Sequence, residues 1–209
     1  MYLCIVLIER NIQIFQMDSK DDIREHIVEA ARHIFSRFGF KKTTMDDIAL
    51  GVGKGKSSIY YYFTSKDQVF QAVVEKEINI LRSELLKVIE SDLNPIDKIQ
   101  GYVTVRMTKF GQMTNFYQAI KSELIGQMDY INQIRKSYDE DEISLVERIL
   151  VEGVQTNVFN IEDSRLASIV LVTAMKGLEI PLFWNEGDDN IESRLKNVLK
   201  ILFNGILKK

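Results

Sequence analysis

Side chains suited to binding phosphate groups and base edges are concentrated in one short stretch of the sequence. Lysine ammonium groups and short hydroxyls bind phosphate oxygens, and a tyrosine adds a phenol and a ring that packs on sugar or thymine methyl groups. Consecutive helical residues point about 100° apart, so at least one of the three consecutive tyrosines must face outward. The candidate contacts to nucleic acid are Thr44, Lys54, Lys56, Ser57, Ser58, Tyr60, Tyr61, Tyr62 and Lys66.

Two short helices on either side of a glycine-rich turn are expected to position these side chains. Thr44 is a good N-cap for a short helix with an apolar face of Met45, Ile48, Ala49 and Val52, and the acidic pair after Met45 places negative charge in its first turn. A second helix fits residues 56–62, and Ser65 then caps a long helix that begins at Lys66. The break between the short helices contains Gly51, Gly53 and Gly55. This pattern predicts a helix-turn-helix whose second helix binds DNA.

The charge of this region supports the same interpretation. Between residues 32 and 66 there are seven lysine or arginine residues and two acidic ones, a local charge of about +5, whereas the whole chain carries −3. A basic patch in an acidic protein is typical of a DNA-binding module. The alternative, an ordinary helical hairpin with aromatic packing and solvated lysines, does not predict this asymmetry.

Two segments, IVEAARHIFSRFGFKKTTMDDIA and SSIYYYFTSKDQVFQAVV, carry a recognisable combination of motifs. In them, Phe38-Gly39-Phe40 ends a first helix, Thr44 precedes Ile48-Ala49, and a tyrosine-rich run ends in Phe63 and Lys66. From residue 27 to about residue 76, the chain resembles the N-terminal domain of the TetR family of bacterial transcriptional regulators. The resemblance implies an all-helical homodimeric repressor whose affinity for DNA falls when a small molecule binds the rest of the chain.

The resemblance also implies a role for each candidate contact. Thr44, Tyr60, Tyr62 and Lys66 would contact phosphates, Tyr61 would lie in or beside the groove, and the N-terminal end of the second helix would approach base edges with Lys56, Ser57 and Ser58. Two positions depart from the family pattern. Lys54 replaces a small apolar residue, and Ser57 replaces a glycine or proline. The turn is therefore expected to pack differently.

Beyond this module the sequence predicts a helical bundle. Helices are expected over residues 66–91, from Asn94-Pro95 onward, and over 116–127, 131–153, 166–183 with an interruption near Pro181, and 190–207. The predicted fold is all-α, with an N-terminal three-helix helix-turn-helix domain, a C-terminal helical bundle and about nine helices in total. The expected division is an extension over 1–17, the DNA-binding domain over 18–65, and a ligand-binding and dimerisation domain over 66–209.

Residues 1–17 are apolar but interrupted by Glu9 and Arg10, and they lack the pattern of a signal peptide. We favour an upstream extension, with a segment that packs on the dimer or on DNA as the alternative. The single Cys4 excludes an intramolecular disulfide and suits a reducing cytoplasm. His26 and His33 lack the spacing of a zinc pair, and no residue grouping suggests catalysis, a cofactor or a metal.

Two further surfaces are expected in the C-terminal part. A dimer interface is assigned to Ala167, Val170, Ala174, Leu178, Trp184, Leu195, Leu199 and Leu202, with a plain core as the alternative. Methionine and aromatic side chains suit an adaptable apolar ligand pocket, again with a plain core as the alternative: Tyr102, Met107, Phe110, Met113, Phe116, Tyr117, Met128 and Tyr138. Arg106 and Lys109 are interpreted as exposed cations, with a contact to an anionic ligand as the alternative.

These observations lead to one functional interpretation and one alternative. The chain is interpreted as a cytoplasmic, homodimeric, TetR-like repressor that a small-molecule effector releases from double-stranded operator DNA. The alternative is a DNA-binding protein of the same fold that acts through a protein partner without a small ligand. Neither interpretation includes an enzymatic activity, a cofactor, a metal or a membrane partner.

Overall fold

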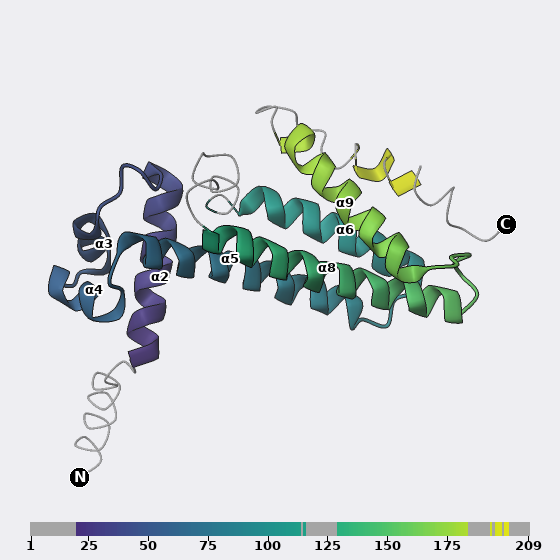
Figure 1. Cartoon of the computed structure of the whole chain (residues 1–209), viewed down its shortest axis with the longest axis horizontal. Coiled ribbons are helices and arrows are strands. Elements are labelled where there is room, and N and C mark those ends of the chain that lie inside the picture. The colour runs from purple at the N-terminus through teal and green to yellow at the C-terminus, as the bar shows by residue number, and fades with distance from the viewer. Residues whose placement is uncertain are drawn as a thin grey trace, which may run out of the picture. The chain divides into compact units, whose positions relative to one another are not determined.

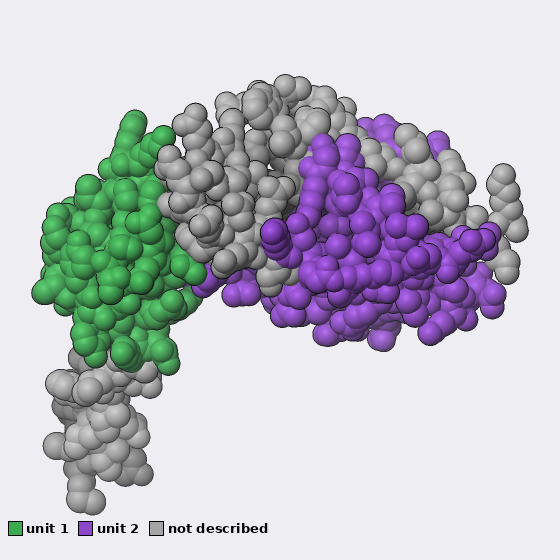
Figure 2. All heavy atoms as spheres, in the orientation of Figure 1, with its two compact units in different colours: residues 1–73 green, residues 74–209 purple. Residues whose placement is uncertain are grey.

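The computed structural model describes residues 20–113, 115, 129–183, 193, 195–197 and 199–200. The regular elements among these residues are α-helices (Figure 1), which confirms the predicted all-α class. The chain divides into two compact units, unit 1 over Met1–Val73 and unit 2 over Val74–Lys209 (Figure 2). None of the described helices is long and apolar enough to cross a membrane.

Unit 1 is built from α2 (Lys20–Phe38), α3 (Met45–Val52), α4 (Lys56–Tyr62) and the first turns of α5 (Lys66–Ile89). α2 packs on α3, and α3 packs on α4. An aromatic cluster joins the start of α5 to the rest of the unit: the rings of Phe35 and Phe70 meet edge to face at 5.2 Å, and those of Phe40 and Phe70 lie 4.8 Å apart. This packing explains why the division between the units falls inside α5 rather than at its first residue.

Unit 2 contains the rest of α5, α6 (Pro95–Gln112), α8 (Asp129–Gln155) and α9 (Ser164–Phe183). α8 packs against α6 and α9. The predicted start of α6 is confirmed, since the Asn94 side chain accepts a hydrogen bond from the Asp97 amide at 3.0 Å and Pro95 is the first helical residue. The start of α9 is capped in the same way by Asp163, whose carboxylate accepts from the Leu166 amide at 2.9 Å.

A run of four consecutive acidic residues on α8 connects the helices of unit 2. Consecutive helical side chains point in different directions, so neighbouring carboxylates reach different helices. Each member of the run forms an ion pair: Asp139 with Lys176 and Glu140 with Arg165 on α9, Asp141 with Arg82 on α5, and Glu142 with Arg106 on α6. A second bridge joins α6 to α8, where Lys98 donates to both oxygens of Glu152 at 2.8 and 2.9 Å.

Two expectations for unit 2 are wrong. Arg106 is buried, with 1% of its side chain exposed, because Glu142 supplies a buried counter-charge. α9 is not interrupted at Pro181 but continues to Phe183. Pro181 removes one backbone hydrogen bond from the last turn of α9 without ending the helix there. The predicted extension over 1–17, the predicted helix over 116–127 and most of that over 190–207 lie outside the described residues.

Candidate nucleic-acid interface

Thr44 begins α3 with a reciprocal capping box, as its sequence context predicts. Its hydroxyl accepts from the Asp47 amide at 3.2 Å, while the Asp47 carboxylate accepts from the Thr44 amide at 2.8 Å and from the Thr44 hydroxyl at 2.7 Å. These hydrogen bonds from the Thr44 hydroxyl and amide lower the pKa of the Asp47 carboxyl group. The box fixes the first turn of α3 and leaves Thr44 exposed at the surface.

Two glycines shape the end of α3 and the turn that leads to α4. Gly53 has a φ of 68°, in the left-handed region, and its amide ends α3 by bonding to the Leu50 carbonyl at 3.1 Å. A Cβ atom on Gly51 would lie 2.7 Å from Cδ1 of Ile34 on α2, so a glycine here permits close packing of α3 on α2. Lys54 is exposed on this turn, where the family pattern has an apolar residue.

α4 presents the predicted contacts because two apolar residues hold its other face. Ile59 and Phe63 are buried in the core of unit 1. Tyr60 and Tyr61 are exposed, Tyr61 at 69%, whereas Tyr62 is half-buried. The prediction that at least one of the tyrosines faces outward is therefore confirmed. The N-terminal half of α4 adds the exposed side chains Lys56, Ser57 and Ser58.

Lys56 is already paired in this arrangement. Its Nζ donates to Oδ2 of Asp46, in the first turn of α3, at 2.8 Å. The hydrogen bond and the charge of Asp46 raise the pKa of the Lys56 ammonium. The pair joins the two helices of the helix-turn-helix across the turn, and both side chains remain exposed.

Lys66 has a structural role in addition to the predicted phosphate contact. Its Nζ donates to the carbonyls of Phe40 and Thr43 at 2.8 and 2.9 Å and lies 4.3 Å from the centre of the Phe40 ring. These contacts tie the start of α5 to the segment between α2 and α3. An ammonium has three N–H donors, so one remains for a phosphate. The phosphate contact stays a prediction.

Two cations of α2 lie beside aromatic side chains of this candidate interface, and the sequence analysis did not predict them. Nζ of Lys20 lies 5.1 Å from the centre of the Tyr61 ring, and the Arg24 guanidinium lies 5.0 Å from that of Phe63. Lys20 and Arg24 are four residues apart, so they occupy one face of the helix. That spacing is the signal that could have placed them with the recognition surface.

Four of the eight predicted ligand-pocket residues are buried in the core of unit 2. Tyr102, Met107, Met113 and Tyr138 are buried, and the side chains of Phe110, Phe116, Tyr117 and Met128 lie outside those described. Of the four buried residues, Met107 alone lines a small enclosed cavity of about 40 Å³. The Tyr102 hydroxyl donates to Glu142 at 3.2 Å, and burial, followed by the charge of Glu142, raises the pKa of Tyr102.

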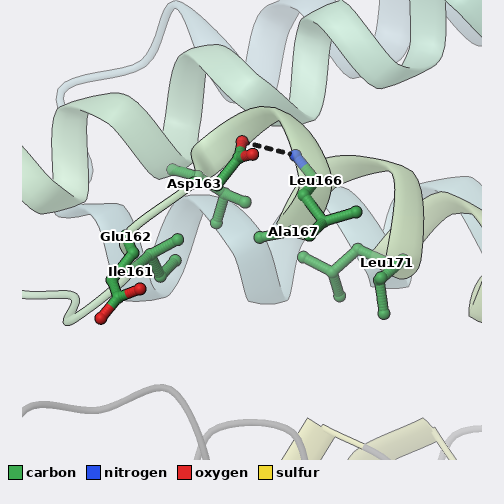
Figure 3. A pocket seen from close by; sticks show the side chains of 8 residues that line it. Ile161, Glu162, Asp163, Leu166, Ala167 and Leu171 are labelled. Carbon is green, nitrogen blue, oxygen red and sulfur yellow. Dashed lines mark hydrogen bonds between the residues drawn. The ribbon is translucent and has the colours of Figure 1, made fainter.

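The predicted dimer residues separate into two groups. Leu195 and Leu199 are buried within the chain and line the small cavity, together with Ala174 and Leu178. Leu195 and Leu199 are therefore not exposed to a partner. Ala167 and Val170 instead line an open apolar groove of about 470 Å³ beside the start of α9, whose walls include the residues drawn in Figure 3. Trp184 and Leu202 lie outside the described residues.

The chain is similar to several known proteins. Residues 27–73 match the family model described as bacterial regulatory proteins, tetR family. IcaR of Staphylococcus aureus strain Newman, a negative transcriptional regulator of a biofilm operon, is 27% identical over 138 residues, which cover 59% of this chain and 73% of IcaR. The family-model match includes the candidate DNA-binding module.

Solved structures support the fold over most of the chain. A transcriptional regulator from Cytophaga hutchinsonii is 25% identical, with a TM-score of 0.75 and coverage of 88% of this chain and 98% of the other. A complex of SmeT, the repressor of a Stenotrophomonas maltophilia efflux pump, with triclosan is 17% identical, with a TM-score of 0.71 and coverage of 90% and 92%. TetR-family proteins are regulators and not enzymes. The family match over the helix-turn-helix, the similarity to IcaR and the shared fold together show that this chain belongs to the TetR family of DNA-binding transcriptional regulators.

Proposed function

We propose that the protein is a homodimeric cytoplasmic repressor that leaves its operator when a small molecule binds unit 2. The observation that carries the proposal is the presentation of α4. The buried side chain of Ile59 anchors α4 to the core of unit 1, while Lys56 and Tyr61 are exposed on the other side of the helix. A short helix held in this way can enter the major groove without rearrangement of its own unit. The names of IcaR and SmeT, a negative regulator and a repressor, favour repression over activation.

Dimerisation is supported by the exposed apolar side chains of α9. Leu166 and Val170 are 57% and 59% exposed, and Ile169 is also exposed. Leu166 and Val170 line the open groove together with Ala167. Large apolar side chains that gather on one exposed face indicate an interaction surface. A second copy is the partner that a near-palindromic operator requires.

Release by an effector requires a connection between the sensing part and the DNA-binding part. α5 is one continuous helix from Lys66 to Ile89 and contributes residues to both units. A ligand that prefers one arrangement of unit 2 would shift the population of the helix-turn-helix units through α5. Both copies of the recognition helix would then lose the spacing that the operator needs.

The pockets of unit 2 favour a second mode of control, in which a protein partner replaces the small molecule. Among the described residues of unit 2, the cavity that Met107 lines has a volume of about 40 Å³, and the larger groove of about 470 Å³ beside α9 is open. Small-molecule sites are usually clefts or cavities of roughly 300–1,000 Å³ that bury most of the ligand. A regulator of this fold that responds to a protein partner needs no such cavity. Thermal-shift screening separates the two modes, because a small molecule that binds the native state raises the melting temperature.

The proposed DNA function is tested by fluorescence anisotropy with the gene's own promoter region at several salt concentrations. Wild-type protein should bind with an affinity that falls steeply as salt increases, since lysines displace counterions from the phosphates. Tyr61→Ala should weaken operator binding about tenfold, within the range of about 1–3 kcal/mol for a stacking or base-edge contact. Lys87→Ala, which removes an exposed cation of unit 2, is the matched control and should bind like the wild type. Salt-independent or absent binding by folded wild-type protein would overturn the proposal.

A further inference from the structure

The ammonium of Lys56 is shared between two candidate partners, one inside the protein and one on DNA. In the structure it donates to Asp46 at 2.8 Å, and the two side chains are 53% and 64% exposed. Lys56 is the first residue of α4, where the nearest approach to base edges is expected. Asp46 therefore places a negative charge within the surface that should meet phosphates.

The carboxylate of Asp46 is not needed to begin α3. The capping box uses Thr44 and Asp47, whose hydrogen bonds fix the first turn without Asp46. An acidic residue in a first turn does stabilise a helix, but Asp47 already supplies that charge. The position of Asp46 is thus better explained by its contact across the turn than by helix formation.

The contact has different consequences for random and operator DNA. Random DNA offers Lys56 a phosphate oxygen. When Lys56 leaves the carboxylate for this phosphate, one anionic acceptor replaces another, so the free energy of binding gains little. An operator also offers base edges, such as O6 and N7 of guanine, whose contacts depend on sequence. An internal carboxylate that competes for the ammonium therefore penalises the sequence-independent contact more than the sequence-dependent one.

We propose that Asp46 is a specificity-determining residue that holds Lys56 as an internal substitute for a phosphate, so that random DNA competes poorly for this lysine. The inference rests on the proposed operator binding by α4. It predicts that loss of the carboxylate raises affinity for random duplexes more than affinity for the operator. A carboxylate that instead braced Lys56 in its DNA-contacting position would give the opposite result, with operator affinity reduced.

The test compares Asp46→Asn with wild type on a promoter fragment and on a random duplex of equal length, across a salt series. Exposed ion pairs have strengths that correspond to about a two- to fivefold change in an equilibrium constant for each subunit. Asp46→Asn should tighten random binding by at least that factor and leave operator binding less changed, so the specificity ratio should fall. The salt dependence on random DNA should also become steeper, since Lys56 now displaces a counterion.

Two further variants separate the ion pair from a general change in charge. Asp67→Asn removes an exposed carboxylate from the first turn of α5 and serves as the matched control. In a Lys56→Met background, Asp46→Asn should have no larger effect than this control, because the partner of the carboxylate is gone. Circular dichroism melting curves for each variant establish that unit 1 stays folded.

The possible outcomes distinguish this inference from the function on which it rests. Folded wild-type protein that fails to bind its promoter overturns the proposed function. Wild-type protein that binds the promoter while Asp46→Asn behaves like Asp67→Asn overturns the role of Asp46 alone. Reduced operator affinity in Asp46→Asn, or an effect that persists without Lys56, also contradicts the competition proposed here.

Discussion

Two ion pairs in this protein join helices in very different surroundings. Lys56 and Asp46 meet across the turn of the helix-turn-helix, where both side chains are more than half exposed. Arg106 and Glu142 meet between α6 and α8, where the exposed fractions are 1% and 0%. Both pairs connect two helices of the same unit, but water reaches the first pair and is excluded from the second.

The difference in solvent access determines what each pair can do. Water screens an exposed pair, so it contributes between about 0 and 1 kcal/mol and exchanges partners easily. A buried pair has lost the hydration of both charges, and removal of one partner leaves an uncompensated charge that costs about 3–5 kcal/mol. The exposed pair is thus suited to exchange with DNA, whereas the buried pair is suited to holding α6 on α8.

Other contacts reinforce this contrast. The Glu142 carboxylate also accepts from the Tyr102 hydroxyl, and the guanidinium of Arg106 reaches both of its oxygens. Two-point contact of this kind restricts orientation as well as distance. Around Lys56 the structure gives one ammonium contact, to Asp46. A single contact on a long flexible side chain leaves the lysine able to turn toward a new acceptor.

The largest expected effect comes from breaking the buried pair. Arg106→Met should destabilise unit 2 by about 3–5 kcal/mol, because Glu142 would remain buried without its counter-charge. Urea denaturation followed by circular dichroism measures the change. The double variant Arg106→Met/Glu142→Leu should recover most of the loss. Equal destabilisation by the single and double variants would contradict the assigned role of the charge.

The next effect tests the anchoring of α4. Ile59 is fully buried, and Ile59→Ala should cost about 2–5 kcal/mol through lost burial and the cavity left behind. DNA binding should fall with stability, since α4 loses its main contact with the core. Tyr61→Ala is the counterpart, expected to weaken DNA binding at nearly unchanged stability. A stable Ile59→Ala protein with normal binding would show that α4 is held by other contacts.

The cap of α3 should contribute less. Thr44→Ala removes the hydroxyl that accepts from the Asp47 amide and should destabilise unit 1 by about 1 kcal/mol. Thermal denaturation provides the measurement, and Thr64→Ala is a control at an exposed threonine outside a helix. Operator affinity should fall as well if Thr44 contacts a phosphate, so unchanged affinity would remove that predicted contact.

The same cap predicts a dependence on pH. The pKa of Asp47 is lowered in the folded protein below its usual value of 3.8, chiefly by the hydrogen bond from the Thr44 side chain. The carboxylate therefore contributes stability above the unfolded pKa, and this contribution is lost as the pH falls through the lowered folded pKa. The difference in melting temperature between wild type and Asp47→Asn should shrink as the pH is lowered from 6 to about 3. A constant difference across this range would contradict the assignment.

The smallest expected change in stability is at the exposed pair. Lys56→Met should leave the free energy of unfolding nearly unchanged, because water screens this exposed pair. Its effect on DNA should be larger, with weaker binding and a salt dependence reduced by about one phosphate contact per subunit. Stability measured by urea denaturation should therefore stay nearly constant while the anisotropy titration changes. A large loss of stability would show that the pair is structural.

Much of unit 1 could be predicted because its signals are local. Thr44 with Asp47 predicts a capped helix start, and the glycines of the turn predict its end, as the structure confirms. Ser65 and Asn94 likewise mark the starts of α5 and α6. Each of these motifs involves residues within one helical turn, so their geometry depends little on the rest of the chain.

The interactions of unit 2 were harder to predict from the sequence. Arg106 was expected to be exposed, because nothing near it in sequence reveals that Glu142 lies opposite. The consecutive carboxylates of α8 look like a solvated charged face until the three helices around them are placed. In unit 1, the clamp from Lys66 to the carbonyls of Phe40 and Thr43 also joins residues far apart in sequence.

The sequence by itself determined the helix starts, the tyrosine-rich recognition helix and the basic character of the DNA-binding module. Those properties arise from capping, backbone conformation and net charge within short stretches of the chain. Only the tertiary structure decided which charges are buried, which lysine is paired with which carboxylate, and which apolar residues of α9 are exposed. The reason is physical: the strength and role of a charged side chain depend on its solvent exposure and on partners that folding brings from other helices.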